Sequence, residues 1–195
     1  GLLFFCSHIK RCNHNFNIMK TFNLIKLFFI LILVPMSLMG QTKFESRKYN
    51  YSFIYPEGWS RKDQIYDPSV DAKIVDGRGN SFIVSIKSFP TYSSQSAKEQ
   101  MESLSNQELK EQFDAVSGET EIVKRGTVYV GMKEFYYIHM LAPYVDGYKL
   151  YHKMFYYSEG NKVMAIDACS IESYKDETSP AFGIMISTFE FSNLK

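Results

Sequence analysis

Four side chains in the C-terminal half of the chain are of types that bind metals or perform nucleophilic chemistry: His139, His152, Asp167 and Cys169. Imidazole, carboxylate and thiolate groups are the ligands that zinc and similar ions prefer. A cysteine beside a histidine can also form a nucleophile and its general base. The alternative is structural, because a single strand cysteine is commonly buried and inert, and histidines can simply satisfy neighbouring polar groups.

Two turn sequences predict how these four residues meet. The Asp-Gly pair at 146–147 is a strong hairpin signal, because a type I′ turn needs positive φ at both central residues, and the Gly-Asn pair at 160–161 can serve similarly. Two-residue turns at both places would pair His152 with Leu141 on one side and with Cys169 on the other. All four side chains would then share one face of three adjacent strands. A change of one residue in either turn would separate the set, since strand faces alternate.

The elements that would position these residues are mostly strands. Alternating apolar runs bounded by glycine and asparagine predict strands at 51–55, 70–75, 81–89, 120–130, 132–142, 148–157 and 162–171. A capping box at Ser105 and apolar residues at helical spacing predict a helix over 96–116, in one piece or two, which ends at Gly118.

The end of the chain predicts a second helical region and a closing strand. Residues 172–186 read as helix, with a restart at Ser179-Pro180, and 187–191 as a short strand. Strands, helix, a meander of strands, helix and strand together favour an α+β domain with a mainly antiparallel sheet. Both faces of the central strands are rich in large apolar residues, so we expect other elements to cover both sides of the sheet. The polar residues 41–50 are expected to be a loose lead-in.

The first of these strands runs into Pro56-Glu57-Gly58-Trp59, which includes the only tryptophan of the chain. Proline has no N–H for a ladder, so Pro56 can end the strand, and Gly58 turns freely. We expect the turn to fold Trp59 back over the sheet as a plug at one end of the core. The alternative is that Trp59 lines a ligand pocket.

The sequence from Met19 onward has the pattern of a secretory signal peptide. Lys20 and Lys26 form a short basic region, residues 27–39 are largely apolar, and the small residue Gly40 precedes the expected cut. The apolar run is shorter than the ~20 residues that a membrane-spanning helix needs. The pattern therefore favours cleavage and export to the periplasm or the exterior.

This pattern divides the chain into an upstream extension at 1–18, a signal peptide at 19–40 and one domain at 41–195. The extension contains zinc-binding residue types, which we expect to be untranslated or removed: Cys6, His8, Cys12 and His14. The domain keeps 18 of the 22 basic residues and all 21 acidic ones, a net charge of −3. Such a charge argues against a nucleic-acid binder, which would normally show a clustered basic excess.

Tyrosines crowd the central hairpin of the predicted sheet. Tyr144, Tyr148 and Tyr151 lie at or near its turn, where exposed tyrosines would suit a protein interface. The alternative is again structural, because tyrosine is an ordinary strand former.

Three stretches resemble the PsbP-like family, which includes the extrinsic PsbP subunit of photosystem II, a Ran-binding import factor and bacterial exported proteins. They are YSFIYPEGW at 51–59, TVYVGMKEFYY at 127–137 and ISTFEF at 186–191. The resemblance spans about residues 50–191 and implies an αβα sandwich around an antiparallel sheet.

The same resemblance implies a protein that acts by binding other proteins rather than as an enzyme. No partner-binding residue is carried over, because no stretch matches the family's binding regions. We expect an exported, non-enzymatic domain without a cofactor that binds an envelope protein or complex. The alternative is a small-ligand or metal-binding domain that uses Trp59 or the face with His139, His152 and Cys169.

Overall fold

The computed structural model describes residues 40–89 and 96–194. The compact unit that carries the fold begins at Thr42. The expectations for the upstream extension at 1–18, with its cysteines and histidines, and for the signal peptide up to residue 39 lie outside the described residues. Within the described part of the chain, no helix is long and apolar enough to cross a membrane.

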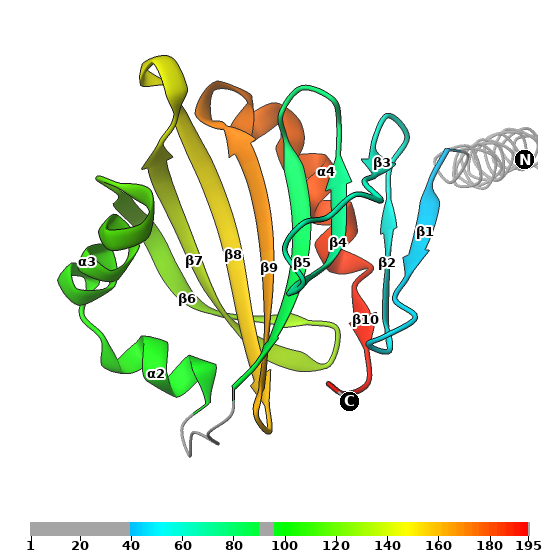
Figure 1. Cartoon of the computed structure of the whole chain (residues 1–195), viewed down its shortest axis with the longest axis horizontal. Helices are drawn as coiled ribbons and strands as arrows, with labels where there is room; N and C mark the ends of the chain where they lie inside the picture. The colour runs from blue at the N-terminus through cyan, green and yellow to red at the C-terminus, as the bar shows by residue number, and fades with distance from the viewer. Residues whose placement is uncertain (1–39, 90–95, 195) are drawn as a thin grey trace, which may run out of the picture. The chain divides into compact units, whose positions relative to one another are not determined.

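Two antiparallel sheets form the framework of the domain (Figure 1). The large sheet has seven strands in the order β3 (Ser60–Arg61), β4 (Val70–Val75), β5 (Ser81–Ser88), β9 (Lys162–Ile171), β8 (Lys149–Glu159), β7 (Lys133–Pro143) and β6 (Glu121–Val130). The small sheet has three strands in the order β1 (Thr42–Glu45), β2 (Tyr51–Tyr55) and β10 (Glu190–Phe191). The predicted α+β class with a mainly antiparallel sheet is confirmed.

In the described residues, three α-helices accompany the sheets: α2 (Ala97–Ser103), α3 (Asn106–Ser117) and α4 (Lys175–Ser187). The same part of the chain contains two short 3-10 turns, η1 (Val145–Gly147) and η2 (Glu172–Tyr174). The predicted capping box at Ser105 is present, and Gly118 ends α3 with a φ of 82° while its N–H bonds to the Asp114 carbonyl. The predicted helical region at 96–116 is therefore two helices, each with its own capping box.

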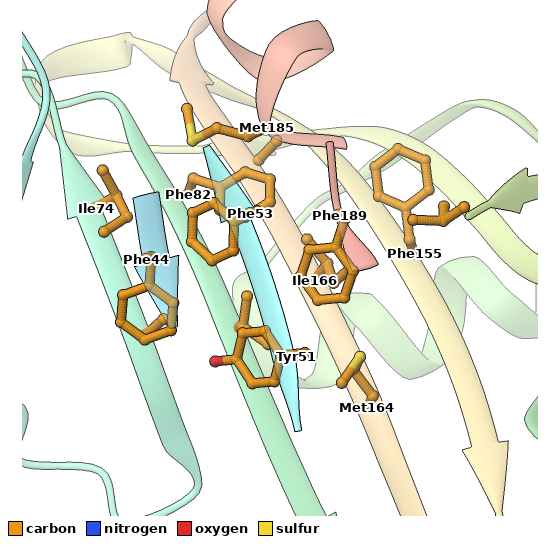
Figure 2. Close-up of a cluster of buried hydrophobic side chains, with 14 of the residues drawn as sticks. Phe44, Tyr51, Phe53, Ile74, Phe82, Phe155, Met164, Ile166, Met185 and Phe189 are labelled. Atoms are coloured by element: carbon orange, nitrogen blue, oxygen red, sulfur yellow. The ribbon is translucent and has the colours of Figure 1, made fainter. Parts of the chain in front are cut away.

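One face of the large sheet, here called the α4 face, carries the main core (Figure 2). The small sheet and α4 cover it, and Phe53 of β2 packs against both Phe82 of β5 and Phe189. The ring centroids of Phe53 and Phe82 are 5.0 Å apart, and those of Phe53 and Phe189 are 5.8 Å apart. Offset aromatic pairs of this kind add to the stabilisation that apolar burial itself supplies.

The opposite face, here called the α2 face, carries a smaller core under α2 and α3. Leu109 of α3 is its buried helical residue, and it packs on alternate residues of β7 and β8. The strand residues of this core are Tyr136, Ile138, Met140, Ala142 and Met154. Elements thus cover both sides of the sheet, as predicted from the apolar residues on both faces of the central strands.

The structure corrects two expectations about the ends of the domain. Residues 41–50 are not a loose lead-in, because they contain β1 and bury Phe44 and Tyr49 in the main core. The last helix does not restart at Ser179-Pro180; α4 begins at Lys175 and continues through Pro180. Phe182 and Met185, both buried, hold this helix against the α4 face despite the hydrogen bond that proline cannot donate.

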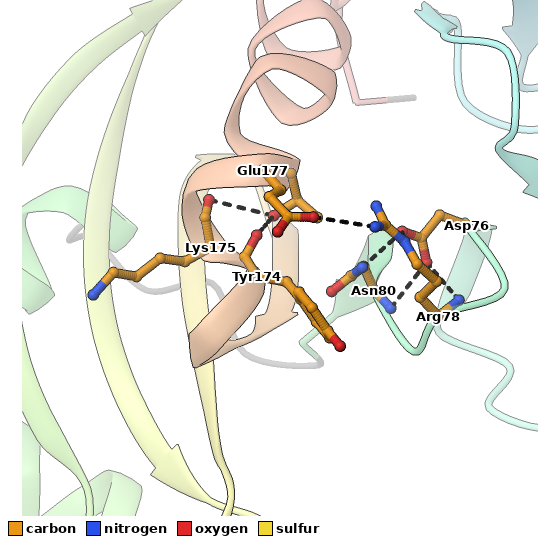
Figure 3. A network of polar contacts seen from close by, with 7 residues as sticks. Asp76, Arg78, Asn80, Tyr174, Lys175 and Glu177 are labelled. Carbon is orange, nitrogen blue, oxygen red and sulfur yellow. Dashed lines mark hydrogen bonds and ion pairs between the residues drawn. The ribbon is translucent and has the colours of Figure 1, made fainter.

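A polar network ties the loop between β4 and β5 to the start of α4 (Figure 3). Asp76 accepts hydrogen bonds from the Asn80 amide, at 2.6 Å, and from Arg78 Nε, at 3.2 Å. Arg78 also reaches Glu177 of α4 at 3.2 Å, and its guanidinium lies 5.7 Å from the centre of the Tyr174 ring. The network thus joins two segments that are 99 residues apart in the chain.

Candidate functional site

The hairpin of β8 and β9 brings His152 directly opposite Cys169, as predicted. The turn has two residues, Gly160 and Asn161, and Gly160 adopts a φ of 59°. Directly opposite residues on a sheet face are close enough for their side chains to interact. The predicted register of β8 and β9 is therefore confirmed.

The hairpin of β7 and β8 has a different register from the predicted one, and this moves His139 away from the others. His139 faces Lys153, and His152 faces Met140. The turn contains three residues, Val145–Gly147, rather than two, and the backbone N–H of Tyr144 donates to the Tyr148 carbonyl at 2.8 Å. The expected positive φ angles at 146–147 are present, at 55° and 77°. One extra turn residue shifts the pairing by one and places His139 on the α4 face.

The remaining three residues form a linear chain of contacts on the α2 face. His152 Nδ1 lies 3.0 Å and 3.1 Å from the two carboxylate oxygens of Asp167. On the other side of the ring, Nε2 lies 3.8 Å from Cys169 Sγ. A thiol, an imidazole and a carboxylate in this order match the general arrangement of a nucleophile, its base and the group that orients the base.

The two contacts determine the protonation state of His152. Burial on its own would lower the pKa of His152, but its hydrogen bonds to Asp167 and Cys169 outweigh burial and raise the pKa to about 10. The ring therefore carries a positive charge at neutral pH. In general, a positively charged imidazole beside a cysteine favours the thiolate form of that cysteine.

The same geometry counts against a shared metal ion at these residues. Asp167 and Cys169 contact opposite nitrogens of the His152 ring, so their ligand atoms do not converge on one point. A metal site needs three or four ligand atoms around one ion. No group of three or more histidine, cysteine, aspartate or glutamate residues that could hold a metal ion occurs in the part of the chain that the structure describes.

His139 occupies a cationic environment on the α4 face. Its Nδ1 lies 3.0 Å from the Tyr151 hydroxyl. Burial lowers the pKa of His139 to about 4, and the positive charges of Lys124 and Lys153 contribute in the same direction. Lys153 donates a hydrogen bond to Ser179 Oγ of α4 at 2.6 Å. His139 is therefore neutral at physiological pH and takes part in packing between the sheet and α4.

A cavity that the sequence did not indicate lies on the α2 face, beside α2. Its volume is about 500 Å³, and its wall includes Ser85 of β5, Tyr156 of β8, Ala165 of β9, and Ala97 and Met101 of α2. The wall is mainly apolar, and small side chains on β5 and β9 leave the space open. The small residues Ser85 and Ala165, which face each other on β5 and β9, were the available sequence signal, but they indicate a cavity only once α2 is placed above them.

Trp59 packs against the core, as expected if the turn before it folds the ring back over the sheet. Its ring lies edge-on to Phe182 of α4 with centroids 5.5 Å apart, and it joins the main core as a partly buried residue. Gly58 before it has a φ of 83°, and the Trp59 N–H closes the turn on the Pro56 carbonyl at 3.3 Å. The turn therefore folds the tryptophan back over the domain.

The three tyrosines near the hairpin turn occupy two different environments. Tyr144 and Tyr148 project from the turn with 51% and 58% of their surface exposed, and Val145 between them is 60% exposed. Tyr151 is half-buried and pairs with His139 instead. The structure thus defines an exposed hairpin tip made of Tyr144, Val145 and Tyr148.

Comparisons with solved structures give the fold a family context. The solution structure of cyanobacterial PsbP (CyanoP) from Synechocystis sp. PCC 6803 matches 78% of this chain and 93% of its own, with 19% identity and a TM-score of 0.59. LpqN of Mycobacterium tuberculosis, a protein involved in cell envelope biogenesis, matches 78% of this chain and 91% of its own, with 9% identity and a TM-score of 0.51.

A third match is a protein of Bacteroides thetaiotaomicron VPI-5482, with 16% identity and a TM-score of 0.50. It is matched over 79% of this chain, which spans only 49% of that protein. No family model and no curated protein matches the sequence. The domain has a PsbP-like fold, in agreement with the resemblance seen in its sequence motifs.

Proposed function

We propose that this chain is an exported, non-enzymatic PsbP-like domain that binds an envelope protein through its hairpin tip. The observation that carries the proposal is the exposure of Tyr144, Val145 and Tyr148 at one end of the large sheet. Tyrosine is enriched at protein interfaces because its ring supplies apolar contact area and its hydroxyl remains able to hydrogen-bond. The signal-peptide pattern at 19–40 and the fold shared with an envelope-biogenesis protein support the envelope as the location.

The tip is also held in a defined shape. The N–H of Tyr144 donates to the Tyr148 carbonyl at 2.8 Å, and the N–H of Tyr148 donates to the Val145 carbonyl at 3.1 Å. A loop that is ordered before binding loses less conformational entropy when a partner engages it. The exposed side chains therefore sit on a backbone that is already arranged for contact.

The test begins with the tagged protein in its native cell, crosslinked in the intact envelope and purified, with its partners identified by mass spectrometry. A double variant, Tyr144→Ala with Tyr148→Ala, should lose most of the recovered partner, while the thermal unfolding midpoint stays unchanged. Tyr129→Ala is the matched control, because Tyr129 is 69% exposed on β6 and away from the tip. Equal recovery of the partner with the double variant and with the control would exclude the tip as the binding surface.

A second candidate function is the binding of a small apolar ligand in the cavity beside α2. Its volume of about 500 Å³ and its mainly apolar wall fall in the usual range for ligand pockets. Native mass spectrometry of the purified protein should then show a bound molecule. Ala165→Leu would fill part of the cavity and release that molecule, while Ala165→Ser should retain it.

A further inference from the structure

We propose that Cys169 is a modification site: a thiol activated by His152 and Asp167 that small peroxides oxidise to a sulfenic acid. The geometry behind this proposal is the chain of contacts on the α2 face. His152 Nε2 lies 3.8 Å from Cys169 Sγ, and Nδ1 lies 3.0 Å from Asp167. This role is separate from partner binding at the hairpin tip and does not depend on it.

The pairing of β8 with β9 places these three side chains next to one another. His152 and Cys169 are directly opposite each other on β8 and β9, and Asp167 precedes Cys169 by two residues on the same face of β9. Asp167 contacts Nδ1 of the His152 ring, so Nε2 remains for the contact with the Cys169 sulfur. Both strands are interior to the seven-stranded sheet, which limits relative movement of the three side chains.

The positive charge of His152 is the electrostatic basis of the proposed activation. The thiolate, not the thiol, is the nucleophile in cysteine chemistry, and an adjacent imidazolium stabilises it. The hydrogen bonds to Asp167 and Cys169 hold the pKa of His152 at about 10 against the effect of burial, so the ring is an imidazolium at neutral pH. The other titratable side chains that the strand register places on this face nearby are Tyr156 on β8 and Lys73 on β4.

The low exposure of Cys169 restricts which oxidants can reach its sulfur. Cys169 is 7% exposed, and the side chains of His152 and Asp167 are 16% and 27% exposed. This opening suits hydrogen peroxide or a small organic hydroperoxide better than the thiol of another protein. The part of the chain that the structure describes contains no second cysteine that could trap the product as a disulfide.

The reaction balances with the groups present and one peroxide. The Cys169 thiolate attacks one peroxide oxygen, so a sulfur–oxygen bond forms and the oxygen–oxygen bond breaks. Sulfur is oxidised to the sulfenic acid, and the peroxide is reduced. The departing hydroxide takes the proton of the His152 imidazolium and leaves as water.

The test measures the rate of sulfenic acid formation at Cys169 in the full chain. Hydrogen peroxide is added at pH 6 in the presence of dimedone, and the adduct on the Cys169 peptide is quantified by mass spectrometry in native and in urea-denatured protein. An unperturbed thiol with a pKa of about 8.5 is almost wholly protonated at pH 6. We expect the native rate to exceed the denatured rate by about tenfold or more, because the folded site supplies the thiolate.

Two variants separate this mechanism from a general effect of folding. His152→Asn should bring the native rate down to the denatured rate or below it. His139→Asn is the matched control: it changes a histidine of the neighbouring strand on the opposite face and should leave the rate unchanged. A native wild-type rate at or below the denatured rate would overturn the proposal without any variant, and so would an unchanged rate in a folded His152→Asn protein.

Discussion

His139 and His152 lie on neighbouring strands of one sheet, β7 and β8, and point to opposite faces of it. His152 is held between Asp167 and Cys169, which raise its pKa to about 10. His139 lies between the rings of Tyr137 and Tyr151. Burial, together with the positive charges of two nearby lysines, lowers its pKa to about 4. One sheet thus keeps one histidine charged and the other neutral at the same pH.

This relationship predicts how stability depends on pH. The folded-state pKa of His152 lies above its ordinary value of 6.5, so its stabilising contribution is complete below pH 6.5 and is lost as the pH rises towards 10. The folded-state pKa of His139 lies below 6.5, so its contribution is present above pH 6.5 and is lost as the pH falls through 4.

Urea denaturation at a series of pH values would measure both effects as the free energy of unfolding. His152→Gln should flatten the decline between pH 6.5 and 10, and His139→Gln should flatten the decline between pH 6.5 and 4. Each variant is the control for the other, because the two residues contact different groups. Curves for both variants that run parallel to the wild-type curve over the whole range would contradict the prediction.

We predict that substitution of glycine by alanine has opposite effects on stability at Gly147 and at Gly183. Gly147 in the hairpin tip has a φ of 77°, so Gly147→Ala forces a side chain into the left-handed region and should lower stability by about 1 kcal/mol. Gly183 lies inside α4, where an added Cβ would meet nothing within 4 Å. Gly183→Ala should therefore raise stability, by up to about 1 kcal/mol, through the better helix propensity of alanine.

The two alanine variants are compared by chemical denaturation, and the difference in the free energy of unfolding is the quantity to examine. Loss of stability in Gly183→Ala would indicate that α4 packs more tightly around position 183 than the structure shows. An unchanged Gly147→Ala would mean that the turn is able to change its conformation without cost.

Trp59 supplies a third prediction, because it is the only tryptophan of the chain and lies edge-on against Phe182. Trp59→Ala should lower the free energy of unfolding by roughly 2 kcal/mol, less than the cost at a fully buried aromatic residue, since the ring is only partly buried. Trp59→Phe should retain most of the stability. Tryptophan fluorescence of the wild type should shift to longer wavelength on unfolding, and an unchanged stability of Trp59→Ala would argue against its role as a plug over the core.

The two hairpins show why one strand register could be predicted and the other could not. The Gly-Asn pair at 160–161 closes a two-residue turn, and the pairing of β8 with β9 follows from it. The Asp-Gly pair at 146–147 has the positive φ angles expected of a two-residue turn, but Val145 joins the turn as a third residue. The positive φ angles at 146–147 fit a two-residue turn and a three-residue turn equally well. The local sequence therefore does not distinguish the two turn lengths.

Long-range packing explains the other differences. Residues 41–50 look polar, but β1 pairs with β2 and buries Phe44 beside Phe53. Pro180 looks like a helix start, but the buried residues Thr178, Phe182 and Met185 on either side of it hold α4 as one helix. In both segments, contacts with elements far away in the sequence outweigh the local preference.

The class of fold, most of the strands, the helical region at 96–116 with its capping box at Ser105, and the pairing of His152 with Cys169 could all be predicted from the sequence, because they depend on alternation, capping and one short turn. Three features follow only from the folded arrangement: His139 lies on the opposite face, Asp167 and Cys169 contact opposite nitrogens of the His152 ring, and a cavity lies beside α2. The physical reason is the same in each case: side chains converge according to strand register and to the helices placed over the sheet, and both depend on contacts between residues far apart in the chain.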